Sequence, residues 1–343
     1  MRQNTSISPK NSNSTNSKSF VNKTVNKSTP LDTLAQLSRY PKEKLKLETK
    51  KSGSIVKKQW AKYISTFVAV NLIESNRGGV LEKSYRNTVY CSYVQLRTDE
   101  DKIKSTYCKN RWCYTCNRIR TAQWINGYLP ELEKLKDPYF VTLTLPTVDR
   151  NDLKAQIDRM QDTWRKIYRK AQRVSYNRLN GTFKGIRKAE CTIRPNDKYH
   201  FHYHIILSGK GPAEWLINEW LQHFPEANQD AQDYRKADEN SFKELFKYFT
   251  KLTSKTNKTV DYKRLNVIFE ELRGRRVYQP FGGIKAIDEE DFEELAPDIE
   301  VKNRFDRIYR WVDDDWYGLA TGEGLSGKRI PEKIEELKGK FEK

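Results

Sequence analysis

Three of the four histidines in the chain occupy alternate positions in one short run, at His200, His202 and His204. Alternate side chains of a β-strand share one face, so a strand at this position places the three imidazoles side by side. Imidazoles two residues apart can converge on one divalent ion, and Glu190, on a neighbouring strand, can add a carboxylate ligand. We therefore predict a metal site formed by Glu190 and the three histidines.

The nitrogen and carboxylate donors of this site suit Mn²⁺, with Mg²⁺ as the alternative, and leave coordination positions for a phosphate oxygen. Such an ion would polarise and orient a scissile phosphodiester. Zinc takes the same ligands in hydrolases, and a polar strand face without any metal is the simplest alternative.

A helix predicted over 241–254 carries Glu244 and Tyr248 four residues apart on one face, with Lys251 on the same side. Tyrosine has an ordinary pKa of about 10, so a nucleophilic Tyr248 needs a nearby cation such as Lys251, or a metal-bound phosphate. Its attack on phosphorus would give a 5′-phosphotyrosine and a free 3′-hydroxyl, and Glu244 could later activate water. Two alternatives stay open, because Ser241 and Glu244 fit a capping box and Tyr248 fits a core aromatic.

Four of the five cysteines fall in one segment, at Cys91, Cys108, Cys113 and Cys116. Four thiolates can form a closed tetrahedral site for structural zinc. In a reducing compartment a tight cluster favours metal over disulfides, although reduced, unligated cysteines are the alternative. The remaining Cys191 is expected to be a small buried hydrophobic residue.

The elements that must position these groups follow an α+β order. The periodicity predicts helices over 55–72, 151–174, 212–225, 241–254 and 262–272, and one more starting near Thr121. It predicts strands over 138–146, 185–193, 199–207 and 277–287, the last with a break at Gly282-Gly283. A turn at Pro195-Asn196-Asp197 joins the second and third strands. This order predicts a central antiparallel sheet with flanking helices and a small cysteine-rich zinc knuckle.

Composition divides the chain into four parts. We expect a disordered basic tail over 1–50, a helical segment with the cysteine cluster over 51–125, a catalytic domain over 126–290 and a C-terminal extension over 291–343.

The formal net charge of +19 indicates a polyanionic partner, and the many aromatic residues among the basic ones suit stacking on single-stranded nucleic acid. No apolar run is long enough to span a membrane, and the N-terminus lacks the apolar segment of a signal peptide. Both features favour a cytoplasmic protein without a membrane partner.

Taken together, the motifs resemble those of the HUH endonucleases, whose catalytic domain has a ferredoxin- or RRM-like palm. The run Phe140-Val141-Thr142-Leu143-Thr144-Leu145 resembles their first motif, and His202-Tyr203-His204 resembles their histidine–hydrophobic–histidine motif. A glutamate four residues before a single tyrosine, as in Glu244 and Tyr248, resembles the rolling-circle plasmid replication initiators of Gram-positive bacteria. That group also carries a cysteine cluster ahead of its first motif.

The resemblance implies that Tyr248 nicks one strand of a plasmid origin, that Glu244 directs water to end the cycle, and that His202 and His204 hold the catalytic ion. It implies single- and double-stranded origin DNA as partners. A host DNA polymerase would extend the 3′ end, and a host helicase would be needed because the chain has no Gly-x4-Gly-Lys-[Ser/Thr] phosphate loop.

Three other functions are compatible with these residues. A single-tyrosine HUH transposase or phage initiator would use the same chemistry. A noncatalytic nucleic-acid-binding protein with a zinc knuckle would bind DNA without becoming attached to it. A metal-only phosphodiesterase would cut without a tyrosine.

Overall fold

The structure is a computed structural model that describes residues 52–98, 103–174, 179, 181–246, 260–285 and 307–328. The predicted tail over 1–50, Tyr248 and Lys251 lie outside the described residues, as does much of the predicted C-terminal extension over 291–343.

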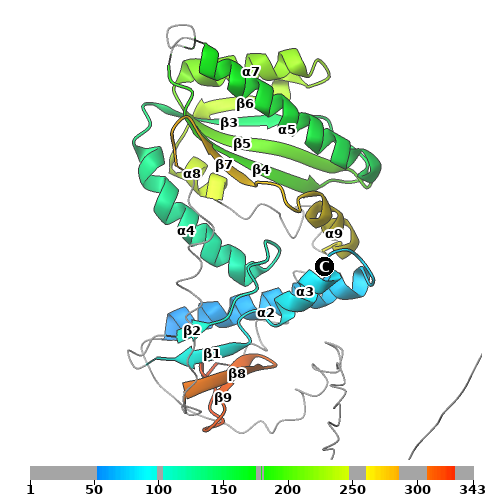
Figure 1. Ribbon diagram of the computed structural model, residues 1–343, viewed down its shortest axis with the longest axis vertical. Coiled ribbons are helices and arrows are strands. Elements are labelled where there is room, and N and C mark those ends of the chain that lie inside the picture. The colour runs from blue at the N-terminus through cyan, green and yellow to red at the C-terminus, as the bar shows by residue number, and fades with distance from the viewer. Residues whose placement is uncertain are drawn as a thin grey trace, which may run out of the picture.

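Two antiparallel sheets and their flanking helices make up the described chain, which confirms the predicted α+β class (Figure 1). The larger sheet has five strands in the order β6-β3-β5-β4-β7. Its strands are β3 (Pro138–Thr144), β4 (Gly185–Ile193), β5 (Tyr199–Ser208), β6 (Asp233–Lys236) and β7 (Tyr278–Phe281).

Strands β4 and β5 form the hairpin at the centre of the sheet. Its turn has Asn196 and Asp197 both at positive φ, a conformation that Asn and Asp tolerate better than other side chains. The amide of Lys198 donates to the carbonyl of Pro195 at 3.3 Å and closes the turn. This turn fixes the register that sets Glu190 directly opposite His202.

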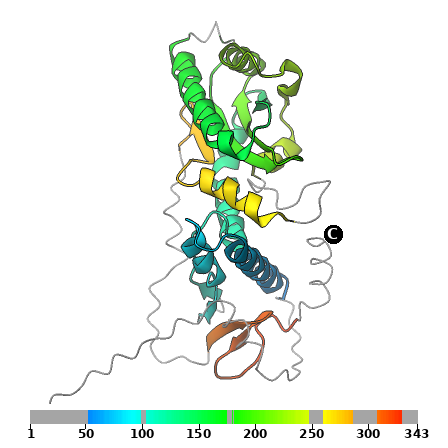
Figure 2. The same cartoon turned by 90° about the vertical axis from the view of Figure 1, so that its right-hand side faces the viewer.

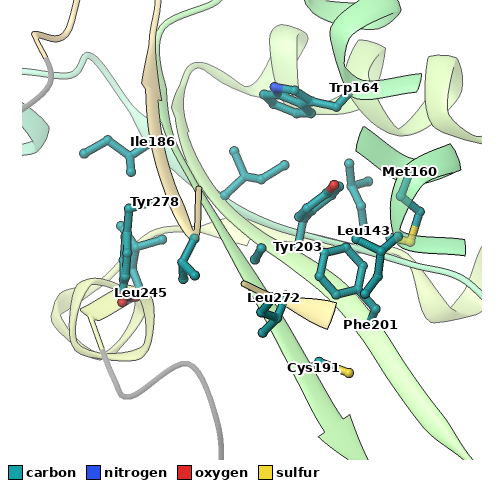
Figure 3. Packing of buried hydrophobic residues seen from close by; sticks show 14 of the residues in the cluster. Leu143, Met160, Trp164, Ile186, Cys191, Phe201, Tyr203, Leu245, Leu272 and Tyr278 are labelled. Atoms are coloured by element: carbon teal, nitrogen blue, oxygen red, sulfur yellow. Dashed lines mark hydrogen bonds between the residues drawn. The ribbon is translucent and has the colours of Figure 1, made fainter. Parts of the chain in front are cut away.

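The two faces of this sheet are covered by different helices. The helices near this sheet are α4 (Tyr114–Glu133), α5 (Arg150–Arg173), α7 (Lys210–His223) and α8 (Glu239–Phe246), with the short 3-10 helix η1 (Gln229–Ala231) before β6. Buried side chains of α5, including Met160 and Trp164, pack on the face that carries Phe201 and Tyr203. Figure 3 shows Tyr278 and Leu245 on the opposite side of the sheet, where α8 lies.

The smaller sheet joins segments from the two ends of the described chain, in the order β2-β1-β8-β9. Its strands are β1 (Val94–Arg97), β2 (Ile103–Ser105), β8 (Ile308–Val312) and β9 (Asp315–Gly318), beside the helices α2 (Ser52–Ser75) and α3 (Glu82–Val89). Trp311 and Trp316 pack together in its core with Trp60 and Tyr63 of α2. This pairing gives the C-terminal aromatic residues a structural role, which the sequence had not suggested.

Helix α9 (Tyr262–Glu271) lies between the larger sheet and α2, as Figure 2 shows in gold between α5 above and α2 below. The hydroxyl of Tyr85 in α3 donates to the side-chain oxygen of Asn266 in α9 at 2.7 Å. Across the described helices, none combines the length and apolar character needed to cross a bilayer.

Element boundaries differ most from prediction near the cysteines. Helix α4 begins at Tyr114 instead of near Thr121, because the thiol of Cys113 caps it and accepts a hydrogen bond from the Cys116 amide. Strand β7 ends at Phe281, where Gly282 and Gly283 both adopt positive φ, at the glycine break predicted within 277–287.

Candidate active site

Three side chains from the central hairpin form a compact donor group, which we call the His–Glu group: Glu190 of β4 and His202 and His204 of β5. Their ligand atoms all lie within 4.8 Å of one another. The two Nε2 atoms are 3.1 Å apart, and Nε2 of His204 lies 3.8 Å from the Glu190 carboxylate. Glu190 is almost fully buried, while His204 retains some contact with solvent.

The outer ring nitrogens of both histidines face other hydrogen-bonding groups. Nδ1 of His202 lies 3.3 Å from the carbonyl of His200, and Nδ1 of His204 lies 3.3 Å from the hydroxyl of Thr142 on β3. A proton on Nδ1 that donates to a carbonyl leaves Nε2 with its lone pair facing the group. The Nε2 atoms, 3.1 Å apart, can share a hydrogen bond when one ring carries its proton there, and both would present lone pairs to a bound cation. This donor chemistry fits a divalent metal ion, with His202, His204 and Glu190 as ligands.

His200 shares the face of the other two histidines, as strand alternation predicts, but the structure does not bring it into the His–Glu group. Its ring instead contacts the hydroxyl of Thr144 and the guanidinium of Arg194, the latter at 3.1 Å. Burial, followed by the charges of His202 and Arg194, lowers the pKa of His200 to about 4. The ring is therefore neutral near pH 7.

Lys188 is a buried cation at this site that the sequence reasoning missed. Its Nζ lies 3.0 Å from the carboxylate of Glu190 and 3.3 Å from the main-chain carbonyl of Glu244. Its side chain has no exposed surface. Lys188 therefore links a candidate metal ligand on β4 to helix α8. Its position two residues before Glu190 on the strand was the available signal, because alternation places both on one face.

Helix α8 is held against the His–Glu face by Tyr278 of β7. The Tyr278 hydroxyl donates to the carbonyl of Leu245 at 2.9 Å, and its ring stacks on Phe246. Burial, and secondarily the charge of Glu190, raises the pKa of Tyr278 well above its ordinary value, so its hydroxyl stays a donor.

Glu244 lies in the second turn of α8 and is not a helix-start residue. The carboxylate of Asp238 accepts the amide of Ser241 at 2.8 Å, so Asp238 caps the helix. The capping-box alternative for Glu244 is therefore wrong. The Glu244 carboxylate does not belong to the His–Glu group.

The four clustered cysteines converge as predicted, with all four sulfur atoms within 4.8 Å of one another. Sγ of Cys116 lies 3.5 Å from that of Cys91 and 3.7 Å from that of Cys108. The amides of Cys108 and Cys116 each donate to a cluster sulfur at 3.5 Å. Four sulfur donors at these separations fit a tetrahedral zinc ion. Cys191 is fully buried in the main core, as expected.

A buried lysine lies beside this cluster. Nζ of Lys62 in α2 donates to the carbonyl of Val89 at 2.6 Å and has no exposure. Burial lowers the pKa of Lys62 to about 8, and the charges of Cys91, Cys113 and Cys108 oppose that shift. A buried ammonium is tolerated when negative charge lies nearby, as thiolates bound to a metal would supply.

Comparison with known proteins supports the resemblance found in the sequence. Residues 101–213 match the model of a family described as replication protein. Over 129 residues the chain is 29% identical to "Protein rep" of Staphylococcus aureus, an alignment that covers 35% of this chain and 53% of that protein. The resemblance to plasmid rolling-circle replication initiators is confirmed.

The family match includes Glu190, His202, His204 and three of the clustered cysteines, and it ends in α7, before α8 begins. The chain spans about half the length of the staphylococcal relative. No solved structure matches the chain.

Proposed function

We propose that this protein initiates rolling-circle replication by nicking one strand of a plasmid origin, with Tyr248 as the nucleophile. The observation that carries the proposal is the convergence of Glu190, His202 and His204, with their ligand atoms within 4.8 Å, on the sheet face that α8 contacts through Lys188. The match to the replication protein family and the relative named "Protein rep" support the same function. Within this proposal the larger sheet is the HUH palm.

Helix α8, which precedes Tyr248 in the chain, contacts the neighbourhood of the His–Glu group. Phe246 stacks on Tyr278, which lies directly opposite Lys188 in the sheet, and Lys188 binds Glu190.

His202, His204 and Glu190 would hold Mn²⁺ or Mg²⁺, which when bound supplies charge that polarises the scissile phosphate. The protein's own groups perform the remaining work. Lys188 holds the Glu190 carboxylate in place at 3.0 Å. Lys251 would favour the phenolate form of Tyr248 through its positive charge.

In the nicking step the phenol oxygen of Tyr248 forms a bond to phosphorus and the bond from phosphorus to the 3′ oxygen breaks. The phenol proton is lost and the departing 3′ oxygen gains a proton, so the step leaves a 5′-phosphotyrosine and a free 3′-hydroxyl. In the closing step Glu244 would accept a proton from water that attacks the phosphotyrosine. That hydrolysis restores the Tyr248 phenol and leaves a 5′-phosphate.

The cysteine cluster would bind one structural zinc ion and fix the start of α4 beside α2. Arg111 and Arg118 lie next to it, so this region can also contact DNA phosphates. The partners would be single- and double-stranded origin DNA, a host polymerase that extends the 3′ end and a host helicase, within the cytoplasm.

The test uses the full-length protein, Mn²⁺ and a single-stranded oligonucleotide from the origin of its own replicon, labelled at the 3′ end downstream of the nick. A denaturing gel should show a labelled band attached to protein. Tyr248→Phe should abolish this band, whereas Tyr234→Phe, which changes an exposed tyrosine of β6, should retain it.

Cutting without any attached protein in Tyr248→Phe would refute the nucleophile and favour a metal-only phosphodiesterase. DNA binding with neither cutting nor attachment in the wild type would favour a noncatalytic binding protein. A joined product between two heterologous target strands, in preference to origin re-ligation, would favour a transposase.

A further inference from the structure

A second basic site lies on the sheet face opposite the His–Glu group. A cavity of about 450 Å³ opens between α5 and the edge strand β7, and we call it the α5–β7 groove. The residues that line it are Asp162, Trp164, Arg165, Tyr168, Arg169 and Gln279, together with Lys166. Figure 3 shows Trp164 of this lining across the sheet from Tyr278 and Leu245.

The groove is rich in positive charge. Arg165, Lys166 and Arg169 are exposed on its α5 wall, and its one carboxylate, Asp162, is already paired with Arg165. No acidic residue of the lining is left to compensate Lys166 or Arg169.

Behind the groove lies a buried guanidinium that forms no ion pair with any described residue. Arg187 of β4 is 3% exposed, and its carbon Cζ lies 4.7 Å from the ring centroid of Trp164 and 4.2 Å from that of Tyr203. Its Nε and Nη1 have no hydrogen-bond partner among the described residues. Aromatic faces offset part of such a charge, but a buried cation normally also has an anionic partner.

Gln279 connects this buried charge to the groove. Nη2 of Arg187 donates to Oε1 of Gln279 at 2.7 Å. Because the amide oxygen faces the guanidinium, the amide NH₂ points away from Arg187 as a donor. The groove therefore combines three exposed cations, an amide donor and the field of a buried cation. This combination favours binding of an anion that can accept several hydrogen bonds.

We propose that the α5–β7 groove binds a phosphate group of the DNA backbone, on the sheet face opposite the His–Glu group. The open groove and its long, exposed cationic side chains suit a phosphate that belongs to an extended polymer better than an enclosed small molecule. The inference rests on the proposed function only for the identity of the polyanion. It assigns a DNA contact separate from the point of cutting, which would hold duplex flanking the nick.

The test measures binding of a labelled duplex by fluorescence anisotropy across a series of salt concentrations, in a Tyr248→Phe background without added metal. The groove variant is Arg165→Gln with Arg169→Gln. The matched control is Lys154→Gln with Arg159→Gln, which removes the same charge from exposed positions of the same helix outside the groove.

We expect the groove variant to lose roughly tenfold in duplex affinity at moderate salt, with a slope of log K against log salt that is shallower by about 1 to 2. The control should keep a slope close to that of the parent protein. Equal effects of the two variants would overturn the proposal. A second result would also overturn the proposal. In it, calorimetry shows saturable ATP binding that the groove variant lacks, while the duplex affinity of the groove variant equals that of the control variant.

A second variant, Gln279→Glu, tests the role of Arg187 without truncating a buried side chain. The new carboxylate would pair with Arg187 and neutralise the field behind the groove, so thermal stability should rise and duplex affinity should fall. Unchanged duplex affinity would refute the groove. Nicking of the single-stranded oligonucleotide by versions that retain Tyr248 is measured separately, so failure of the nicking function is distinguishable from failure of the groove.

Discussion

The substitution Lys188→Met tests how the His–Glu group is held in place. Methionine has a similar length and no charge, so the change removes one partner of a buried ion pair with little change in volume. Neither side chain of the pair exceeds 2% exposure, so Glu190 would be left charged and buried without its ammonium partner.

Breaking a buried pair by removing one partner costs about 3–5 kcal/mol of unfolding free energy. For a protein of this size, that loss lowers the Tm by roughly 10 °C. Adding Glu190→Gln removes the stranded charge and should recover most of the loss. A deficit of about 1 kcal/mol should remain, because the 3.3 Å hydrogen bond from Lys188 to the carbonyl of Glu244 is also lost.

Urea and thermal unfolding, followed by circular dichroism, would give the four free energies of this double-mutant cycle. The two single variants and the double variant should be strongly non-additive. Additive effects, or a loss of unfolding free energy below about 1 kcal/mol in Lys188→Met, would refute the prediction, because they would show that the ion pair does not hold Glu190 in place.

Three further predictions follow from the described residues. Cys113→Ser should lose bound zinc, measured by elemental mass spectrometry, and should lower the Tm because the zinc cross-link is lost, although the serine hydroxyl can still cap α4; full zinc content in the variant would contradict this. His204→Ala should abolish covalent attachment to DNA while His200→Ala, whose ring lies outside the His–Glu group, should retain it on the same gel; equal loss in both would contradict the grouping. Burial raises the pKa of Asp315 from 3.8 to about 6. The folded state therefore binds the carboxyl proton of Asp315 more tightly than the unfolded state does. Protonation of Asp315 stabilises the folded state fully below the ordinary pKa, and this stabilisation is lost as the pH rises through about 6. The difference in unfolding free energy between wild type and Asp315→Asn should therefore shift by on the order of 2 kcal/mol between acidic and neutral pH, and a difference independent of pH would contradict it.

The central hairpin is the part of the fold that the sequence predicts best. Strand β4 matches the predicted 185–193, and β5 extends the predicted 199–207 by one residue. Strand alternation and the Asn196-Asp197 turn are local signals, and they were sufficient to bring Glu190 to the histidines. Helix α5 could be predicted equally well, because its apolar residues repeat with the period of a helix.

Other features depend on contacts that no local pattern carries. Strand β8 pairs with β1, from the far end of the described chain, so the aromatic residues near the C-terminus gave no indication of their partner. The early start of α4 depends on a cysteine thiol that acts as a helix cap, a role outside the usual Ser, Thr, Asp and Asn set. The exclusion of His200 depends on Thr144 and Arg194, whose approach is set by the sheet and the turn.

Strand β4 carries two buried cations, one on each face of the sheet, and their charges are compensated differently. Arg187 and Lys188 are adjacent, both are buried, and alternation directs them to opposite sides of the sheet. Lys188 meets a carboxylate that belongs to the His–Glu group, so its charge is matched within the protein. Arg187 meets two aromatic rings and an amide, so its charge has no anionic match among the described residues. Because desolvating an unmatched guanidinium is unfavourable, an anion in the α5–β7 groove, separated from Arg187 by Gln279, would offset part of that cost.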